Sequence, residues 1–156
     1  MSEARDQSFM QLALAEAQAA AEAGEVPVGA VIVDPADDTV IAAAGNAPIA
    51  GHDPTAHAEI RAIRLAAEKR GNYRLTGLEL FVTLEPCAMC VGAISFARIG
   101  RLVYGASDEK GGAVEHGPRF FEQSICHWSP NIQSGIMADA SATMLRAFFK
   151  ARRGEK

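Results

Sequence analysis

Two short motifs, far apart in the chain, contain the side chains that proteins use to bind a transition-metal ion. The first is His57-Ala58-Glu59 and the second is Pro86-Cys87-Ala88-Met89-Cys90. One imidazole and two thiolates are ligands that Zn²⁺ prefers, and three protein ligands leave a fourth position open for water, as in catalytic zinc sites. If these residues share one ion, the two segments must meet in space. Any fold that keeps them apart is therefore excluded.

The cysteine spacing indicates how the second motif is placed. Cys87 and Cys90 are three residues apart, so their thiols lie on one face if the segment is helical. We expect Pro86 at the first position of that helix, where its missing N–H is tolerated. The free N–H groups and positive dipole of the first turn then favour thiolate over thiol.

The first motif has a different spacing. His57 and Glu59 are two residues apart and point in different directions on a regular helix. They can serve one ion if the metal lies over a helix N-terminus, and Thr55 is the candidate N-cap. Glu59 is then the carboxylate that exchanges protons with a metal-bound water. The two motifs together predict two helix N-termini aimed at one cation.

Two other interpretations of the cysteine pair remain open. In a closed structural site, the fourth ligand would be His52, Cys126 or His127. A redox role for the pair needs a thioredoxin-like context, which the sequence lacks. The combination of His-x-Glu with Pro-Cys-x-x-Cys favours the catalytic site, because it is the signature of zinc nucleobase deaminases.

Length and composition indicate one globular domain over residues 1–156, with 49% apolar and 22% charged residues. The polar N-terminal segment is followed by no long apolar run, so we expect neither a signal peptide nor a membrane span. With two of the three cysteines assigned to a metal, a disulfide framework is not expected, and the location predicted is the cytoplasm. Cys126 is expected to be a packed or partly exposed bystander.

Charge is unevenly distributed. The chain carries a net charge of −4, yet its C-terminal end is basic. Residues 146–156 contain one acidic residue, Glu155, and five basic residues: Arg146, Lys150, Arg152, Arg153 and Lys156. Together with Phe148 and Phe149 they are able to bind phosphates and stack on a base. The alternative is a solvated helix end, where cations are favoured in any case.

Hydrophobic periodicity and turn residues predict strands that alternate with helices. In chain order, the predicted elements are a helix over 6–23, strands over 26–33 and 39–44, a helix up to about 70, a strand over 78–84, a short helix to about 96, strands over 101–104 and 132–136, and a basic terminal helix over about 138–153. This pattern predicts an α/β fold, a three-layer α/β/α sandwich with a central mixed five-stranded sheet.

These segments resemble the tRNA-specific adenosine deaminase family, within the cytidine-deaminase-like superfamily, over about residues 8–153. The most specific of them are Val26-Pro27-Val28-Gly29-Ala30-Val31, Asn46, Asp53-Pro54-Thr55-Ala56-His57-Ala58-Glu59-Ile60, Leu84-Glu85-Pro86-Cys87-Ala88-Met89-Cys90, Gly92-Ala93-Ile94 and Ala97-Arg98-Ile99. Guanine deaminases share much of the two metal motifs. The stretch over 103–113 and the basic terminal helix favour the RNA-editing enzymes.

The resemblance implies hydrolytic deamination of the wobble adenosine in a tRNA anticodon loop to inosine. His57, Cys87 and Cys90 match the family's zinc ligands, with one Zn²⁺ per subunit. Glu59 matches the proton shuttle, which takes a proton from the attacking water and passes it to the ring nitrogen and the leaving ammonia. A homodimer is also implied, in which Met89, Ile94 and Phe96 are interface or core residues, with core as the default.

Four further residues match the family's substrate contacts. Asn46 matches a residue that hydrogen-bonds the base, and Asp108 matches a loop residue that contacts the sugar of a neighbouring nucleotide. Phe149 and Arg152 match positions that face the anticodon loop. The resemblance weakens after residue 113, so it assigns no role to His116, Arg119, His127 or Trp128. Two rival functions remain: a free-base deaminase acting on guanine, and a zinc-stabilised RNA-binding module without catalysis.

Overall fold

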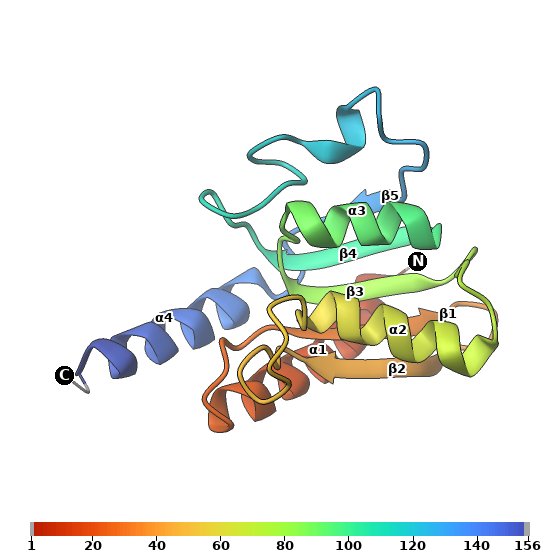
Figure 1. Cartoon of the computed structure of the whole chain (residues 1–156). Coiled ribbons are helices and arrows are strands. Elements are labelled where there is room, and N and C mark those ends of the chain that lie inside the picture. The colour runs from red at the N-terminus through yellow and green to blue at the C-terminus, as the bar shows by residue number, and fades with distance from the viewer. Residues whose placement is uncertain (1, 155–156) are drawn as a thin grey trace.

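The computed structural model describes residues 2–154. Helices and strands alternate along the chain after one β-hairpin, as Figure 1 shows. In order, the elements are α1 (Glu3–Glu22), β1 (Gly29–Asp34), β2 (Thr39–Gly45), α2 (Ala58–Arg70), β3 (Glu79–Leu84), α3 (Ala88–Ala97), β4 (Arg101–Ala106), the 3₁₀ helix η1 (Phe120–Glu122), β5 (Asn131–Gln133) and α4 (Ala138–Gly154).

The strands form one mixed sheet in the order β2-β1-β3-β4-β5. Strand β1 is antiparallel to both of its neighbours, whereas β3, β4 and β5 run parallel. Helices α2 and α3 lie side by side on one face of the sheet (Figure 1). Helices α1 and α4 cover the other face. The predicted α/β fold with a mixed five-stranded sheet is confirmed.

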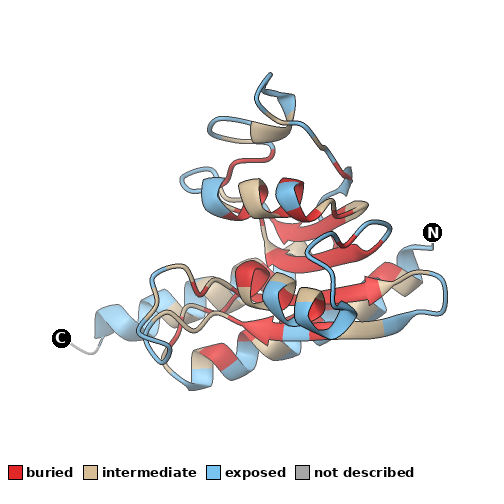
Figure 2. Cartoon of the chain, turned by 45° about the vertical axis from the view of Figure 1, so that its right-hand side comes forward, coloured by how far each residue is buried: buried red, intermediate tan, exposed pale blue. Residues whose placement is uncertain are grey.

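The core follows from the alternation of side chains along the central strands. In β1, Ala30 and Ile32 pack toward α2 and α3, whereas Val31 and Val33 pack toward α1. All four are fully buried, and Figure 2 shows the buried residues concentrated in the central strands and the helix faces against them. A strand buried on both faces reads as a continuous apolar run, and the sequence of β1 shows this pattern.

Helix α1 approaches the sheet very closely. A Cβ atom added to Gly29 would lie 1.9 Å from the backbone oxygen of Ala13 and 2.6 Å from the backbone nitrogen of Ala17. Both alanines are fully buried. Small residues on the two elements therefore allow backbone-to-backbone packing at the start of β1.

Several element boundaries differ from the prediction, and those of β1 and β5 have a clear local cause. Strand β1 begins at Gly29 rather than at residue 26, because the segment before it forms a tight turn in which the Val28 N–H bonds to the Val26 carbonyl. Strand β5 covers three exposed residues rather than 132–136, because Gly135 adopts a left-handed φ of 82° and turns the chain toward α4. None of the helices within residues 2–154 has both the length and the apolar character needed to cross a membrane.

Candidate active site and metal centre

The two sequence motifs meet at the N-termini of α2 and α3. His57 is the N-cap residue of α2, and Cys87 is the N-cap residue of α3. The expected N-cap at Thr55 and the expected first helical position of Pro86 are therefore wrong. Pro86 lies just before the cap, where its carbonyl accepts a hydrogen bond from the Ala113 N–H at 2.9 Å. The prediction of two helix N-termini that converge agrees with the structure.

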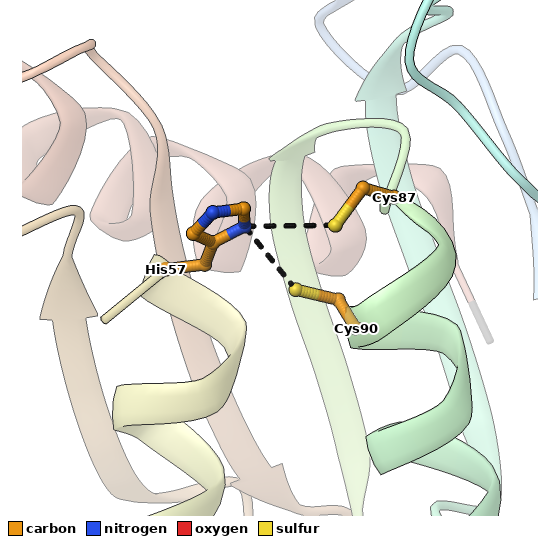
Figure 3. Close-up of side chains that lie close together, drawn as sticks. All are labelled: His57, Cys87 and Cys90. Carbon is orange, nitrogen blue, oxygen red and sulfur yellow. Dashed lines mark hydrogen bonds between the residues drawn. The ribbon is translucent and has the colours of Figure 1, made fainter. Parts of the chain in front are cut away.

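The three candidate ligands form a compact cluster, drawn in Figure 3. His57 Nδ1 lies 3.6 Å from the Sγ atoms of both Cys87 and Cys90, and all three ligand atoms lie within 4.8 Å of one another. Zinc bonds of about 2.1 Å to nitrogen and about 2.3 Å to sulfur place tetrahedral ligands roughly 3.6 Å apart. The donor set and its spacing therefore fit Zn²⁺.

The alternative fourth ligands do not join this cluster within the described part of the chain. His52 and His127 are exposed. Cys126 is half-buried, and its Sγ lies 3.1 Å from the Trp128 carbonyl and 3.7 Å from Ser95 Oγ. This arrangement does not support a closed four-ligand site and agrees with the expected bystander role of Cys126.

The cysteine pair is prepared to carry negative charge. A hydrogen bond from the Cys90 thiol lowers the pKa of Cys87 to about 5, and the backbone N–H groups of Cys90 and Met89 and the His57 imidazole contribute to the same effect. That hydrogen bond, together with burial, raises the pKa of Cys90 well above its ordinary value. Without a cation, the pair therefore holds one thiolate and one thiol. A bound cation would take the place of the second proton.

Glu59 lies beside this cluster, in the first turn of α2, and its side chain is buried. Burial raises its pKa to about 7, and the Cys87 thiolate adds to the rise. A carboxyl group with a pKa near neutrality both accepts and donates protons efficiently.

Asn46 follows β2 and is half-buried. Its Oδ1 accepts a hydrogen bond from the Ala58 N–H at 2.7 Å, which satisfies one of the free donors at the start of α2. The side-chain oxygen is thereby occupied. Within residues 2–154 the structure shows no partner for the NH₂ group, which can therefore donate to a ligand.

Asp108 and Phe149 line the same cavity, of about 550 Å³, between the loop after β4 and helix α4. Asp108 Oδ1 accepts hydrogen bonds from the N–H groups of Lys110 and Gly111, which hold the side chain in a turn. Arg152 is not among the residues that line this cavity. Its guanidinium lies over the Phe148 ring, and one N–H donates to the Gly24 carbonyl at 3.4 Å.

Helix α3 exposes two apolar side chains. Ile94 is fully buried, as expected for a core residue, but Phe96 is 80% exposed and Met89 is 37% exposed. The default assignment of these two residues to the core is therefore wrong.

Trp128 is half-buried, donates its indole N–H to the Ile99 carbonyl at 2.8 Å and lies against the Arg98 guanidinium.

Two buried carboxylates near the site received no role from the sequence. Glu25 accepts hydrogen bonds from the backbone N–H groups of Ile49 and Ala50, in the loop that follows Asn46. Glu85 accepts several from the loop that carries Asp108. Although burial opposes its ionisation, these bonds hold the pKa of Glu85 below its ordinary value. In the sequence, the feature that could have drawn attention to Glu85 is its position at the end of a predicted strand, directly before Pro86 and Cys87.

Comparison with known proteins agrees with this geometry. The sequence model of one protein family, the cytidine and deoxycytidylate deaminase zinc-binding region, matches residues 3–106 of this chain. The chain is 57% identical over 145 residues to the tRNA-specific adenosine deaminase of Agrobacterium fabrum, and the match covers 93% of this chain and 94% of that protein.

Two solved structures are also informative. One, from a study of A-to-I editing by tRNA:A34 deaminases at the wobble position, is 56% identical with a TM-score of 0.86, and covers 88% of this chain and 99% of its own. The guanine deaminase of Nitrosomonas europaea is 25% identical with a TM-score of 0.75, covering 91% of this chain and 83% of its own. The cytidine-deaminase-like fold is thus confirmed, and the chain belongs to the family of tRNA-specific adenosine deaminases.

Proposed function

We propose that this protein hydrolyses the 6-amino group of the wobble adenosine in a tRNA anticodon loop, giving inosine and ammonia. The observation that supports this most is the cluster of three candidate zinc ligands beside a buried carboxylate. It occurs in a chain that is 57% identical, over 145 residues, to a tRNA-specific adenosine deaminase.

His57, Cys87 and Cys90 would hold one Zn²⁺ per subunit, through Nδ1 and two Sγ atoms. When bound there, zinc polarises a water and lowers its pKa to ~7, which supplies a nucleophile at neutral pH. Binding of a cation would displace the remaining thiol proton, and the helix N-termini favour the resulting pair of thiolates.

Glu59 is assigned the proton transfers. Its carboxylate accepts one proton as the water attacks C6 of the base and passes it to the ring nitrogen, then takes the proton of the new C6 hydroxyl and delivers it to the amino group, which departs as ammonia. Burial and a pKa of about 7 allow one group to perform both steps. The reaction is balanced, because one water is consumed and one ammonia is released.

Substrate binding is assigned to two groups of residues. The NH₂ group of Asn46 donates to an acceptor on the base, and Asp108 accepts from the 2′-hydroxyl of a neighbouring ribose, which favours RNA over DNA. Phe149 offers a stacking surface in the same cavity as Asp108, and Arg152 adds positive charge for phosphates. A hairpin loop suits such a site, because its bases are splayed out at little cost.

The decisive experiment is a deamination assay with purified zinc-loaded protein. An anticodon stem-loop with adenosine at the wobble position should yield inosine, whereas the same adenosine in a full duplex should react far more slowly because the base is stacked and paired. Free guanine is the competing substrate. Xanthine formation without inosine would assign the protein to the guanine deaminases instead.

A second measurement addresses the non-catalytic alternative. A zinc-stabilised RNA-binding module would need four protein ligands on the metal. The absorption spectrum of the cobalt-substituted protein reports the ligand set. Evidence of a fourth protein ligand would contradict the catalytic proposal.

We also propose that the protein is a homodimer and that α3 contributes to the interface. Phe96, Tyr73 and Ile125 are each at least 70% exposed, and all line one cavity. Exposed apolar side chains gathered around one cavity mark interaction surfaces. In light scattering, Phe96→Glu should shift the protein to a monomer, whereas Leu12→Glu, on the exposed side of α1, should not. A monomeric wild-type protein would refute the dimer.

We place the protein in the cytoplasm, where its thiols stay reduced.

A further inference from the structure

Glu85 carries a buried carboxylate two residues before the candidate metal ligand Cys87. The residue is 2% exposed, and the hydrogen-bond partners of its carboxylate lie in one other segment of the chain. Oε1 accepts a hydrogen bond from the Asp108 N–H at 3.0 Å and lies 2.8 Å from His116 Nδ1. Oε2 accepts from three consecutive backbone N–H groups, at 3.1, 2.9 and 3.1 Å, which belong to Val114, Glu115 and His116.

This arrangement offsets the cost of burying a charge. A buried carboxylate is unfavourable unless it is paired or hydrogen-bonded, and here both oxygens have several partners. Three successive N–H groups directed at one oxygen resemble the backbone nests that bind anions. The segment over 107–117, called the 107–117 loop below, is therefore wrapped around a charge that belongs to the metal-bearing turn.

Two further hydrogen bonds join the same segments. The Glu85 N–H donates to the Ala106 carbonyl at 2.8 Å, and the Ala113 N–H donates to the Pro86 carbonyl at 2.9 Å. A Cβ atom added to Gly112 would lie 2.4 Å from Glu85 Cδ. The loop backbone thus lies directly against the carboxylate, and glycine is the residue that permits this approach.

We propose that Glu85 is a positioning residue, whose carboxylate anchors the 107–117 loop to the metal-bearing turn and thereby sets where Asp108 meets the substrate. The anchoring itself rests on geometry alone. Its effect on catalysis rests on the proposed function. Glu85 does not touch the metal ligands' donor atoms in this scheme and acts through the loop.

Glu85→Gln is the test variant, because it keeps the shape of the side chain. Whichever way the amide is oriented, its NH₂ group faces backbone N–H donors and opposes them. We expect faster hydrogen exchange at residues 113–116, zinc content equal to that of the wild-type protein, and a KM for the stem-loop raised by about tenfold with a smaller change in kcat. Unchanged exchange in this loop would refute the anchoring.

A double-mutant cycle distinguishes positioning from general destabilisation. If Glu85 acts by placing Asp108, then Glu85→Gln combined with Asp108→Ala should raise KM no more than Asp108→Ala alone. Glu25→Gln is the matched control, since Glu25 is also a buried acceptor of two backbone N–H groups, but in the loop after Asn46. The fold-increases in KM caused by Glu25→Gln and by Asp108→Ala should multiply in the double variant. If the fold-increases caused by Glu85→Gln and Asp108→Ala also multiply, the proposal is wrong.

His116→Ala is a second, milder variant, which tests the same anchoring if Glu85→Gln does not fold. It removes one partner of the carboxylate and leaves the four backbone hydrogen bonds, so a smaller rise in KM is expected, again absent in the Asp108→Ala background. If the wild-type protein forms no inosine, the proposed function fails. In that case, hydrogen exchange of the zinc-loaded protein still decides whether Glu85 anchors the loop.

Discussion

His57 and Cys87 occupy equivalent positions in their helices. Each is an N-cap residue with an extended backbone, and for neither does the structure show a side-chain hydrogen bond that caps its own helix within residues 2–154. An N-cap side chain normally accepts a bond from the first turn. Here Asn46 satisfies a backbone donor of α2 in place of His57. The imidazole and thiol are thereby left for a metal, and Glu59, two residues beyond the cap, reaches the same site.

Glu59→Ala should separate metal binding from catalysis. The variant retains His57, Cys87 and Cys90, so we expect one zinc per subunit by elemental analysis. Loss of the proton shuttle should lower kcat by about 10²–10⁴-fold, the usual contribution of general acid–base catalysis. Turnover at the wild-type rate would remove Glu59 from its assigned role.

His116 provides a pH-dependent contribution to stability. Its hydrogen bond to Glu85 raises the pKa of His116 above the ordinary value of about 6.5. A raised pKa in the folded state means that this stabilisation is complete below pH ~6.5 and is lost as the pH rises through the folded-state pKa. The Tm difference between the wild-type protein and His116→Ala should therefore be largest near pH 6 and smaller at pH 9. A difference that is constant with pH would contradict this.

At the scale of elements, the contact between α1 and β1 depends on a missing side chain. Gly29→Ala would place a methyl group 1.9 Å from the Ala13 carbonyl oxygen, so the helix must move away from the sheet. We expect a decrease of about 3 kcal/mol or more in the free energy of unfolding, measured by urea denaturation. Gly92→Ala is the control. It lies within α3 with open space around its Cβ position, and should gain about 0.5–1 kcal/mol. Equal effects of the two substitutions would refute the close approach of the helix.

The basic end of α4 is the second element with a testable role. Arg152 and Arg153 are exposed in its last turn, whereas Glu155 and Lys156 lie outside the described residues. Replacing both arginines by alanine should weaken binding of the stem-loop. It should also reduce the slope of log K against log salt by about 1.4, or roughly 0.7 for each phosphate that is no longer neutralised. Lys69→Ala with Arg70→Ala, at the C-terminus of α2, removes the same charge away from the metal centre. If both double variants behave alike, α4 has no specific role in RNA binding.

For the whole molecule, a metal would join segments that are far apart in sequence. It would tie the N-terminus of α2, which follows the β-hairpin, to the N-terminus of α3, which follows β3. The sheet and its two covering layers form a large apolar core without any metal ligand. The fold is therefore expected to survive loss of the metal, but with lower stability.

Removal of zinc by a chelator should lower the Tm of the wild-type protein by about 5–10 °C. This corresponds to ~2.7 kcal/mol when free zinc stands at about 100 times its Kd. The Tm should rise again with added zinc. His57→Ala lacks one ligand and should respond much less to the chelator. A wild-type Tm that stays constant despite measured loss of zinc would show that the metal is not linked to folding.

The metal motifs, the alternation of strands and helices and the mixed sheet were all predictable from the sequence, because they depend on local residue chemistry and hydrophobic periodicity. The candidates for proton transfer and metal binding were also predictable from the sequence, because Glu59 and Cys87 lie in short motifs of recognisable spacing. Contacts between distant segments are different. The cap position of Cys87, the exposure of Phe96 and the loop bonds of Glu85 depend on which backbone groups the fold brings beside each residue. A buried carboxylate needs donors, and only the tertiary structure decides which part of the chain provides them.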